Sequence, residues 1–241
     1  MSSGNLPILF DQHGVLAVNK PAGFETYAAG GDKCLTKALR AQLAQNDIDP
    51  AHRLDRDTTG VQLFARGTAS LQRLTELFKH RRTSKFYLAL CFGVPANREG
   101  IIRRNLSKWM GGHRPVSVVK GDGGLTASTE YQVLAFNREF PASLILFHPR
   151  EGRTHQIRVH ASAFGRPVLG DDQYGDRDAN RKIKELSGLK RQALHAWRII
   201  LPEINPDGSM LEICAPLLPD MQRALDLLFP AWREAVGIRD N

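Results

Sequence analysis

Two short polar segments of the 241-residue sequence contain the side chains best suited to chemistry. Residues 51–60 (AHRLDRDTTG) hold two carboxylates, two arginines and a histidine, directly before an apolar run. A carboxylate beside an arginine stays ionised, because a neighbouring positive charge favours the charged form. Asp55 or Asp57 could therefore act as a nucleophile or base rather than as a proton donor. A solvated surface turn is the alternative explanation for this segment taken alone.

The second segment, residues 150–160 (REGRTHQIRVH), places Arg153, His155, Arg158 and His160 at an expected junction between a strand and a helix. We expect this helix to run from about residue 154 to 164, with Gly165 after its end. A helix N-terminus presents unpaired N–H groups and a partial positive charge, which favour phosphate. His155 and His160 are five residues apart, which is not the spacing of helical zinc ligands, so we predict no metal site.

Four motifs in a fixed order make the sequence resemble the RluA-like pseudouridine synthases. Each motif is short, but four in the family's order are highly specific. The resemblance extends over roughly residues 15–216. The matching segments are residues 19–23 (NKPAG), residues 52–55 (HRLD) with 58–60 (TTG, where the family usually has TSG), residues 85–89 (KFYLA), and residues 152–160 (GRTHQIRVH) continuing to 165–171 (GRPVLGD).

The resemblance implies a role for each catalytic candidate. Asp55 resembles the catalytic aspartate, which attacks or deprotonates the ribose of the target uridine. Arg158 resembles the arginine that forms an ion pair with that aspartate. Tyr87 resembles the active-site tyrosine that packs against the uracil ring and assists proton removal from C5.

The resemblance and the charge pattern together indicate RNA-binding residues. Arg53 is similar to the arginine that enters the RNA stack where the target nucleotide has left. The other candidates are basic residues in or near the motifs: His52, Lys20, Arg153, His155, Lys85, Arg81 and Arg82. A second basic cluster comprises Arg103, Arg104, Lys108 and Arg114, and Trp109 beside it could stack on a base or lie in the core.

The implied reaction suits these residue types. Pseudouridine forms when the N1–C1′ bond of uridine breaks, the uracil turns and a C5–C1′ bond closes, which needs no redox change, so we expect no cofactor and no metal. The carboxylate either traps C1′ covalently or removes the C2′ proton, and the sequence leaves both routes open. The uridine must first be flipped out of its stack.

Two other functions compete with this interpretation. Residues 55–59 (DRDTT) resemble the nucleophile loop of haloacid-dehalogenase-type phosphatases, with Asp171 and Asp172 as a magnesium-binding pair. That loop should follow a buried strand, and residues 49–54 (DPAHRL) do not form one. The other alternative is a catalytically silent RNA-binding domain of the same fold, although binding alone does not require Asp55, Tyr87 and Arg158 together.

Composition limits the class of protein and its partners. A hydrophobic content of 42% and a charged content of 24% are typical of a globular protein. The net charge of +8 favours an anionic partner, here large-subunit ribosomal RNA or transfer RNA, over a membrane. Three scattered cysteines, no signal peptide and no long apolar run predict a soluble, cytoplasmic protein. We expect burial of each cysteine and a monomer.

The expected elements predict an α+β fold, a largely antiparallel or mixed sheet with flanking helices. Besides the helix at 154–164, helical spacing is found at residues 35–44, 68–79 and 220–229. Apolar runs between them read as strands that are mostly joined by hairpins. Without a low-complexity linker, we expect residues 1–241 to form a single catalytic domain with no S4-like domain before it. Residues 106–124 and 176–190 are the segments expected to select the RNA.

Overall fold

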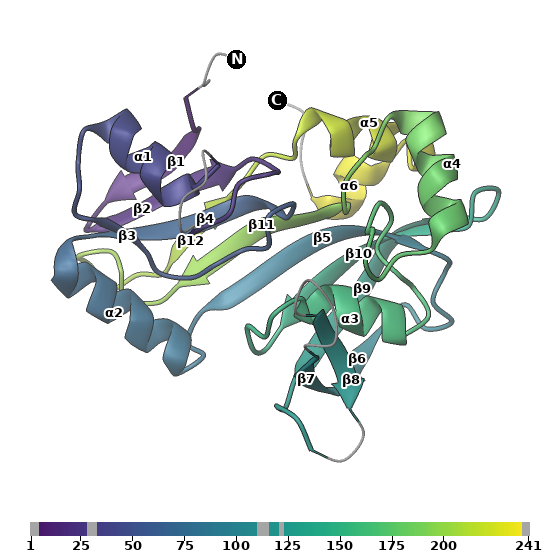
Figure 1. The fold of residues 1–241 in the computed structure, drawn as a ribbon, viewed down its shortest axis with the longest axis horizontal. Coiled ribbons are helices and arrows are strands. Elements are labelled where there is room, and N and C mark those ends of the chain that lie inside the picture. Colours follow the sequence, from purple (N-terminus) through teal and green to yellow (C-terminus); the bar gives the residue numbers. More distant parts are fainter. Residues whose placement is uncertain (1–4, 28–32, 110–115, 121–122, 238–241) are drawn as a thin grey trace. The chain divides into compact units, whose positions relative to one another are not determined.

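The computed structural model describes residues 5–27, 33–109, 116–120 and 123–237. They form two compact units, Met1–Lys85 with His195–Leu217, and Phe86–Leu194 with Leu218–Asn241 (Figure 1). We call them unit 1 and unit 2 and describe each by itself, and one catalytic domain built from both stays a prediction. Among the described residues, no helix is long and apolar enough to span a membrane.

Unit 1 is a sheet with two helices. Its strands follow the order β1-β2-β4-β11, with β3 paired to β4 and β12 paired to β11. The pairs described in this unit are antiparallel except that of β4 with β11, which is parallel. The elements are β1 (Ile8–Gln12), β2 (Val15–Lys20), α1 (Leu35–Leu43), β3 (Ile48–Pro50), β4 (Thr59–Arg66), α2 (Gly67–Lys79), β11 (Leu194–Leu201) and β12 (Leu211–Cys214).

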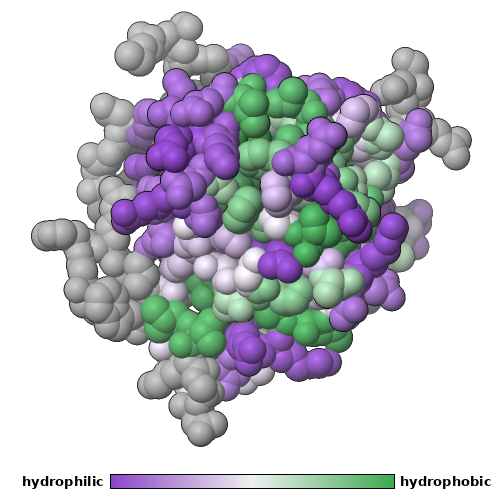
Figure 2. Space-filling model, turned by 90° about the vertical axis from the view of Figure 1, so that its right-hand side faces the viewer, coloured by the Kyte–Doolittle hydropathy of each residue, from purple (hydrophilic) through white to green (hydrophobic). Residues whose placement is uncertain are grey.

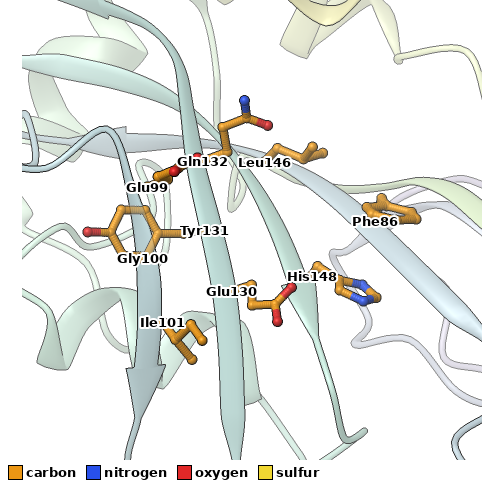
Figure 3. A pocket seen from close by; sticks show the side chains of 9 residues that line it. All are labelled: Phe86, Glu99, Gly100, Ile101, Glu130, Tyr131, Gln132, Leu146 and His148. Carbon is orange, nitrogen blue, oxygen red and sulfur yellow. The ribbon is translucent and has the colours of Figure 1, made fainter.

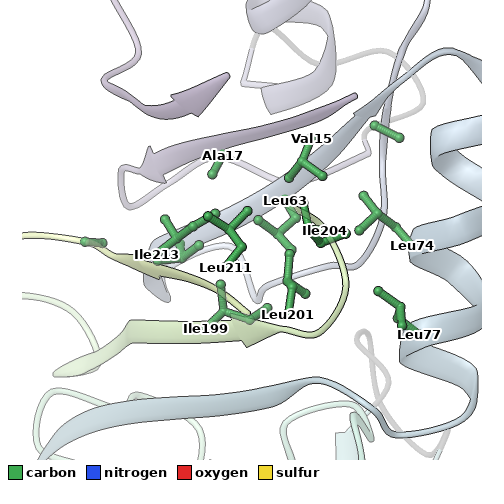
Figure 4. Packing of buried hydrophobic residues seen from close by; sticks show 13 residues of the cluster. Val15, Ala17, Leu63, Leu74, Leu77, Ile199, Leu201, Ile204, Leu211 and Ile213 are labelled. Atoms are coloured by element: carbon green, nitrogen blue, oxygen red, sulfur yellow. The ribbon is translucent and has the colours of Figure 1, made fainter. Parts of the chain in front are cut away.

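Strand β4 is the centre of unit 1 because both of its faces are buried. Successive side chains of a strand point to opposite faces. On one face, Leu63 packs in a cluster with Leu74 of α2 and Ile199 of β11 (Figure 4). On the other face, Phe64 packs with Leu35 of α1. The two helices therefore cover opposite faces of the sheet, and the start of β4 is held within a rigid core.

Unit 2 is an antiparallel sheet in the order β5-β10-β9-β6, accompanied by a separate β7-β8 hairpin. Its helices are α3, α4, α5 and α6. The bounds are β5 (Ser84–Phe92), β6 (Glu99–Arg103), β7 (Asn105–Trp109), β8 (Val116–Lys120), β9 (Ser128–Asn137), β10 (Ala142–Pro149), α3 (Gln156–Ala163), α4 (Arg177–Ser187), α5 (Pro219–Leu228) and α6 (Trp232–Val236).

Helix α3 packs on one face of the unit 2 sheet. The ring of Phe164, the residue after α3, lies 4.8 Å from the ring of Tyr131 on β9. Tyr131 is paired with Phe147, and Phe147 with Tyr87 of β5, so these three side chains share a face. The candidate tyrosine is therefore on the side of the sheet that α3 covers.

The α+β fold class is confirmed, and most expected elements are present within two residues of their predicted ends. Helix α3 begins two residues later than expected because His155 has a left-handed backbone, with φ of 55°. Helix α4 was not predicted as a helix, although Asp176 caps its start by accepting a hydrogen bond from Ala179 and Gly188 ends it with φ of 75°. This helix forms most of the 176–190 segment.

The surface is mixed in character. On the face shown in Figure 2, patches of hydrophobic side chains are separated by hydrophilic ones. Exposed large hydrophobic residues include Leu186 and Leu227. Cys34 and Cys91 are buried as expected, whereas Cys214 is exposed, because it points away from the core on β12. That part of the cysteine prediction is wrong.

Candidate active site

The candidate catalytic aspartate lies on the segment between β3 and β4. A turn begins at Asp55 and closes where the Thr58 N–H donates to the Asp55 carbonyl oxygen at 3.2 Å. Leu54 is buried beside it, whereas Arg53 is exposed and Asp55 is partly exposed. The buried Leu54 before Asp55 and the strand after it fix the turn, and Asp55 itself is partly exposed.

Lys20 ties the NKPAG segment to this turn. Its side chain is fully buried, and its ammonium group donates to the carbonyl oxygens of Arg56 at 2.7 Å, Thr58 at 2.8 Å and Pro21 at 3.1 Å. The Gly23 N–H also donates to the Arg56 carbonyl oxygen, at 2.9 Å. The sequence predicts Lys20 as an RNA contact, but a side chain with no exposed surface positions the turn instead.

Gln62 and His52 hold the other side of the turn. The buried Gln62 side chain accepts from the Leu54 N–H at 3.1 Å and donates to the His52 carbonyl oxygen. The His52 Nε2 atom accepts from the Leu63 N–H at 3.1 Å, and its ring lies 4.9 Å from the Phe78 ring. Burial and the nearby Lys85 charge lower the pKa of His52 to about 3. A neutral His52 that already accepts a hydrogen bond supports the turn and offers no charge to a phosphate.

In unit 2, the Arg158 guanidinium group forms a buried ion pair with Asp171. Its Nε donates to Asp171 Oδ2 at 2.7 Å and its Nη2 to Oδ1 at 2.9 Å, and both side chains are almost fully buried, at 6% and 0% exposure. Burial alone would raise the pKa of Asp171, but Arg158 and the backbone N–H groups of Gln173 and Tyr174 lower it. The family resemblance pointed to Asp55 as the partner of Arg158, and the sequence did not reveal the pairing with Asp171.

A further group of contacts in unit 2 joins Tyr174 to residues of the GRTHQIR segment. His155 Nδ1 is 2.9 Å from the Tyr174 hydroxyl group, which also accepts from the Ser117 N–H at 2.9 Å. The Arg158 guanidinium carbon lies 5.0 Å from the centre of the Tyr174 ring. The Arg153 Nε donates to the Thr126 carbonyl oxygen at 3.4 Å. Tyr174 therefore joins the β7-β8 hairpin to the GRTHQIR segment.

The remaining basic candidates lie on the surface of unit 1 near the start of β5. Arg82 is exposed and pairs with Glu203 at 2.7 Å, Arg81 is exposed, and Lys85 is half-buried. In unit 2, Arg103 and Arg104 are exposed. Arg114 and the side chains of Lys108 and Trp109 are outside the described part of the chain. Arg81, Arg82, Arg103 and Arg104 are thus exposed, and their contact with RNA stays a prediction.

The described residues hold no group of histidine, cysteine and acidic side chains suited to a metal ion. Asp171, proposed by the phosphatase alternative as a magnesium ligand, is occupied by Arg158. Residues 48–50 form β3, which is short and antiparallel to β4, so Asp55 does not follow a parallel strand. Both observations contradict the phosphatase alternative.

A hollow of about 380 Å³ in unit 2 is separate from the candidate residues. Its lining includes Phe86, Glu130 and His148, and the Phe86 and His148 rings stack at 4.6 Å (Figure 3). Phe86 and Tyr87 are adjacent on β5 and so point to opposite faces of the sheet. The hollow is therefore on the face away from Tyr87 and α3.

Comparison with known proteins identifies the family. The family model described as RNA pseudouridylate synthase matches residues 14–163, more than half of the chain. The chain therefore belongs to this family.

Among relatives, ribosomal large subunit pseudouridine synthase C of Rickettsia typhi is 35% identical over 201 residues, which cover 81% of this chain and 63% of that protein. The protein of the same name from Haemophilus influenzae is 35% identical over 225 residues, which cover 92% and 68%. The chain thus spans somewhat less than two thirds of the length of the first of these relatives.

Solved structures agree with this assignment. The structure of human RNA pseudouridylate synthase domain containing 1 is 30% identical, with a TM-score of 0.75, over 97% of this chain and 98% of the other. That of human RNA pseudouridylate synthase domain containing 4 is 27% identical, with a TM-score of 0.74, over 92% of each.

Proposed function

We propose that this protein is an RNA pseudouridine synthase, an isomerase that converts a uridine in structured RNA to pseudouridine. Membership of the family supports this activity. The observation that carries the proposal is the turn at Asp55. Its backbone is held by Lys20 and Gln62, while Asp55 as a residue is partly exposed. A fixed and accessible carboxylate is what a nucleophile or base requires.

In the proposed reaction, the N1–C1′ bond breaks, the uracil turns and C5 bonds to C1′. C5 then loses its proton and N1 gains one, so the product is an isomer of the substrate. Asp55 either attacks C1′ and is later displaced, or removes the proton from C2′. Both routes use the same carboxylate beside the sugar, which is why a single acidic residue carries the proposal.

Other residues of the motifs have supporting roles in this proposal. Tyr87 packs against the uracil ring, and Arg53 takes the place of the flipped nucleotide in the stack. Arg158 provides a positive charge that keeps the catalytic carboxylate ionised. The exposed position of Arg53 supports its assignment, because an intercalating side chain must reach out of the protein. The residues belong to both units, so we propose that both are needed for catalysis.

We propose that the substrate is large-subunit ribosomal RNA. The relatives from Rickettsia typhi and Haemophilus influenzae bear names that specify the ribosomal large subunit. The net charge of +8 suits a polyanion of this kind. The bacterial origin of these relatives and their ribosomal names also support a cytoplasmic location.

The decisive experiment replaces Asp55 and uses Asp57 as its matched control. The protein is incubated with large-subunit ribosomal RNA transcribed with uridine that carries tritium at C5, and the released tritium is counted. Asp55→Asn should reduce the rate by at least about 10³-fold, because it removes the carboxylate without changing its size. Asp57→Asn should stay within about threefold of the wild type, because Asp57 forms a surface ion pair with the neighbouring Arg56 that is worth about 1 kcal/mol or less.

Two results would contradict the proposal. Full activity of Asp55→Asn would exclude Asp55 as the catalytic group. Binding of the RNA without tritium release by the wild type would instead support the catalytically silent RNA-binding alternative.

A further inference from the structure

A buried hydrogen-bonded bridge joins the strand after the Asp55 turn to the neighbouring strand. Thr59, the first residue of β4, lies opposite His195 of β11 in the parallel pair. The Thr59 hydroxyl group is 2.8 Å from His195 Nδ1, and His195 Nε2 is 3.1 Å from the Ala215 carbonyl oxygen. Thr59 and His195 both have 0% exposure. None of the sequence motifs contains His195.

The donor and the acceptor of each hydrogen bond in the bridge can be assigned. The Ala215 carbonyl oxygen can only accept, so His195 Nε2 must carry a proton. In the neutral imidazole ring Nδ1 then accepts, and the Thr59 hydroxyl group donates to it. Removing that hydroxyl would leave a buried acceptor without its donor, which proteins rarely tolerate without rearrangement.

The next residue prevents β4 from shifting against β11. Gly60 has φ of 104°, and a Cβ atom built on it would lie 2.1 Å from the Ala196 carbonyl oxygen. This close approach needs a glycine. Thr59 and Gly60 together therefore fix the end of the turn relative to β11.

The fixed end of the turn is directly connected to Asp55. The Thr58 N–H donates to the Asp55 carbonyl oxygen, and the Thr58 carbonyl oxygen accepts from Lys20. A displacement of Thr59 is thus passed to Asp55 through one residue and one hydrogen bond.

We propose that Thr59 and His195 are positioning residues for the reaction. Their bridge sets where the Asp55 carboxylate stands relative to the sugar, and this inference rests on the proposed function. A misplacement of about 1 Å can reduce a rate by as much as 10²-fold. Loss of the bridge should therefore slow the chemical step and leave RNA binding unchanged, because neither residue has exposed surface that could contact RNA.

The test compares Thr59→Val with Thr59→Ser and Thr36→Val. Valine keeps the shape of threonine but cannot donate, whereas serine keeps the hydroxyl group. Thr36 on α1 provides a matched control in the same unit. It is buried, and its hydroxyl group donates to the Thr26 carbonyl oxygen at 2.7 Å. Thr59→Ala removes the same hydroxyl group and replaces Thr59→Val if the valine variant does not accumulate in folded form.

The readout is the single-turnover rate of tritium release, with enzyme in excess over the C5-tritiated ribosomal RNA and well above its RNA dissociation constant. This rate does not depend on the fraction of active enzyme, so lower stability alone does not change it. Thr59→Val should be at least about tenfold slower, and its RNA dissociation constant should stay within about twofold. Thr59→Ser and Thr36→Val should react at the wild-type rate.

A wild-type single-turnover rate for Thr59→Val would overturn the positioning role and leave the proposed function intact. If the wild type itself releases no tritium, the proposed function fails, and amide hydrogen exchange then decides the positioning role. Thr59→Val should exchange faster than the wild type and Thr36→Val across residues 54–58. Unchanged exchange there would refute the role.

Discussion

The turn that carries Asp55 and the helix that carries Arg158 are stabilised in different ways. In unit 1, Lys20 and Gln62 hydrogen-bond to the main chain around Asp55. In unit 2, Asp171 binds the functional group of Arg158 itself, through two hydrogen bonds. The first arrangement fixes the path of the backbone, and the second fixes the plane of a guanidinium group.

This difference fits the chemistry proposed for each residue. A nucleophile or base has to change its bonding during the reaction, so a protein can fix its backbone but must leave its carboxylate reactive. An arginine that supplies a constant positive charge can be held at its head group by a second carboxylate without losing that charge. We expect substitutions in the two regions to differ accordingly.

The largest effect on stability is expected in unit 2. Arg158→Ala leaves the Asp171 carboxylate buried without its guanidinium partner and should lower the free energy of unfolding by about 3–5 kcal/mol. Urea denaturation monitored by circular dichroism measures this change. In a double-mutant cycle, Arg158→Met with Asp171→Leu should lose less than the sum of the two single variants, and additivity would show that the pair is not coupled.

A smaller but more localised effect is expected for Lys20→Met in unit 1. Methionine keeps most of the side-chain volume but leaves three carbonyl oxygens without the ammonium donor, so the free energy of unfolding should fall by about 2–3 kcal/mol. Because these carbonyls belong to the turn segments, tritium release should also slow. The exposed Lys37 supplies the control, and Lys37→Met should change stability by less than about 0.5 kcal/mol. Equal effects of the two variants would contradict the positioning role of Lys20.

The smallest effect concerns pH. The pKa of His52 is about 3 in the folded protein and near its ordinary value of 6.5 in the unfolded chain. Between these values the unfolded chain binds a proton that the folded protein does not, so stability is lost as pH falls below about 6.5. The contribution of His52 should be roughly 1 kcal/mol per pH unit in this range. His52→Gln, which keeps an acceptor for the Leu63 N–H, should flatten the dependence measured by urea unfolding at pH 7 and pH 5, and an unchanged slope would assign the effect to other groups.

The motifs identified the family correctly, but they did not distinguish residues that could contact RNA from residues that support the turn. Lys20 and His52 are basic residues in matched motifs and were therefore predicted to bind RNA. Whether a basic side chain binds a phosphate depends on its exposure and on its existing partners, which spacing along the chain does not reveal. Lys20 is enclosed by backbone carbonyls, and His52 is neutral.

Local sequence signals also explain which elements were predicted. Helices α1 and α2 have apolar residues at helical spacing, which is visible in any window of the sequence. Helix α4 is very polar, with Ala179 and Ile183 as its buried residues, so its apolar stripe is too narrow to signal a helix. The capping residue Asp176 is the sequence signal that could have predicted the start of this helix.

The sequence by itself determined the family, the α+β class and the identity of the acidic residue proposed for catalysis, because these depend on residue types in a fixed order. Only the tertiary structure decided which groups hold that residue. His195 lies 136 positions from Thr59 and outside all of the motifs. Asp171 lies 13 positions from Arg158 in the same matched segment, but the order of the residues does not show that the two side chains pair. Hydrogen bonds of this kind follow from strand register and burial, which arise only when distant segments pack together.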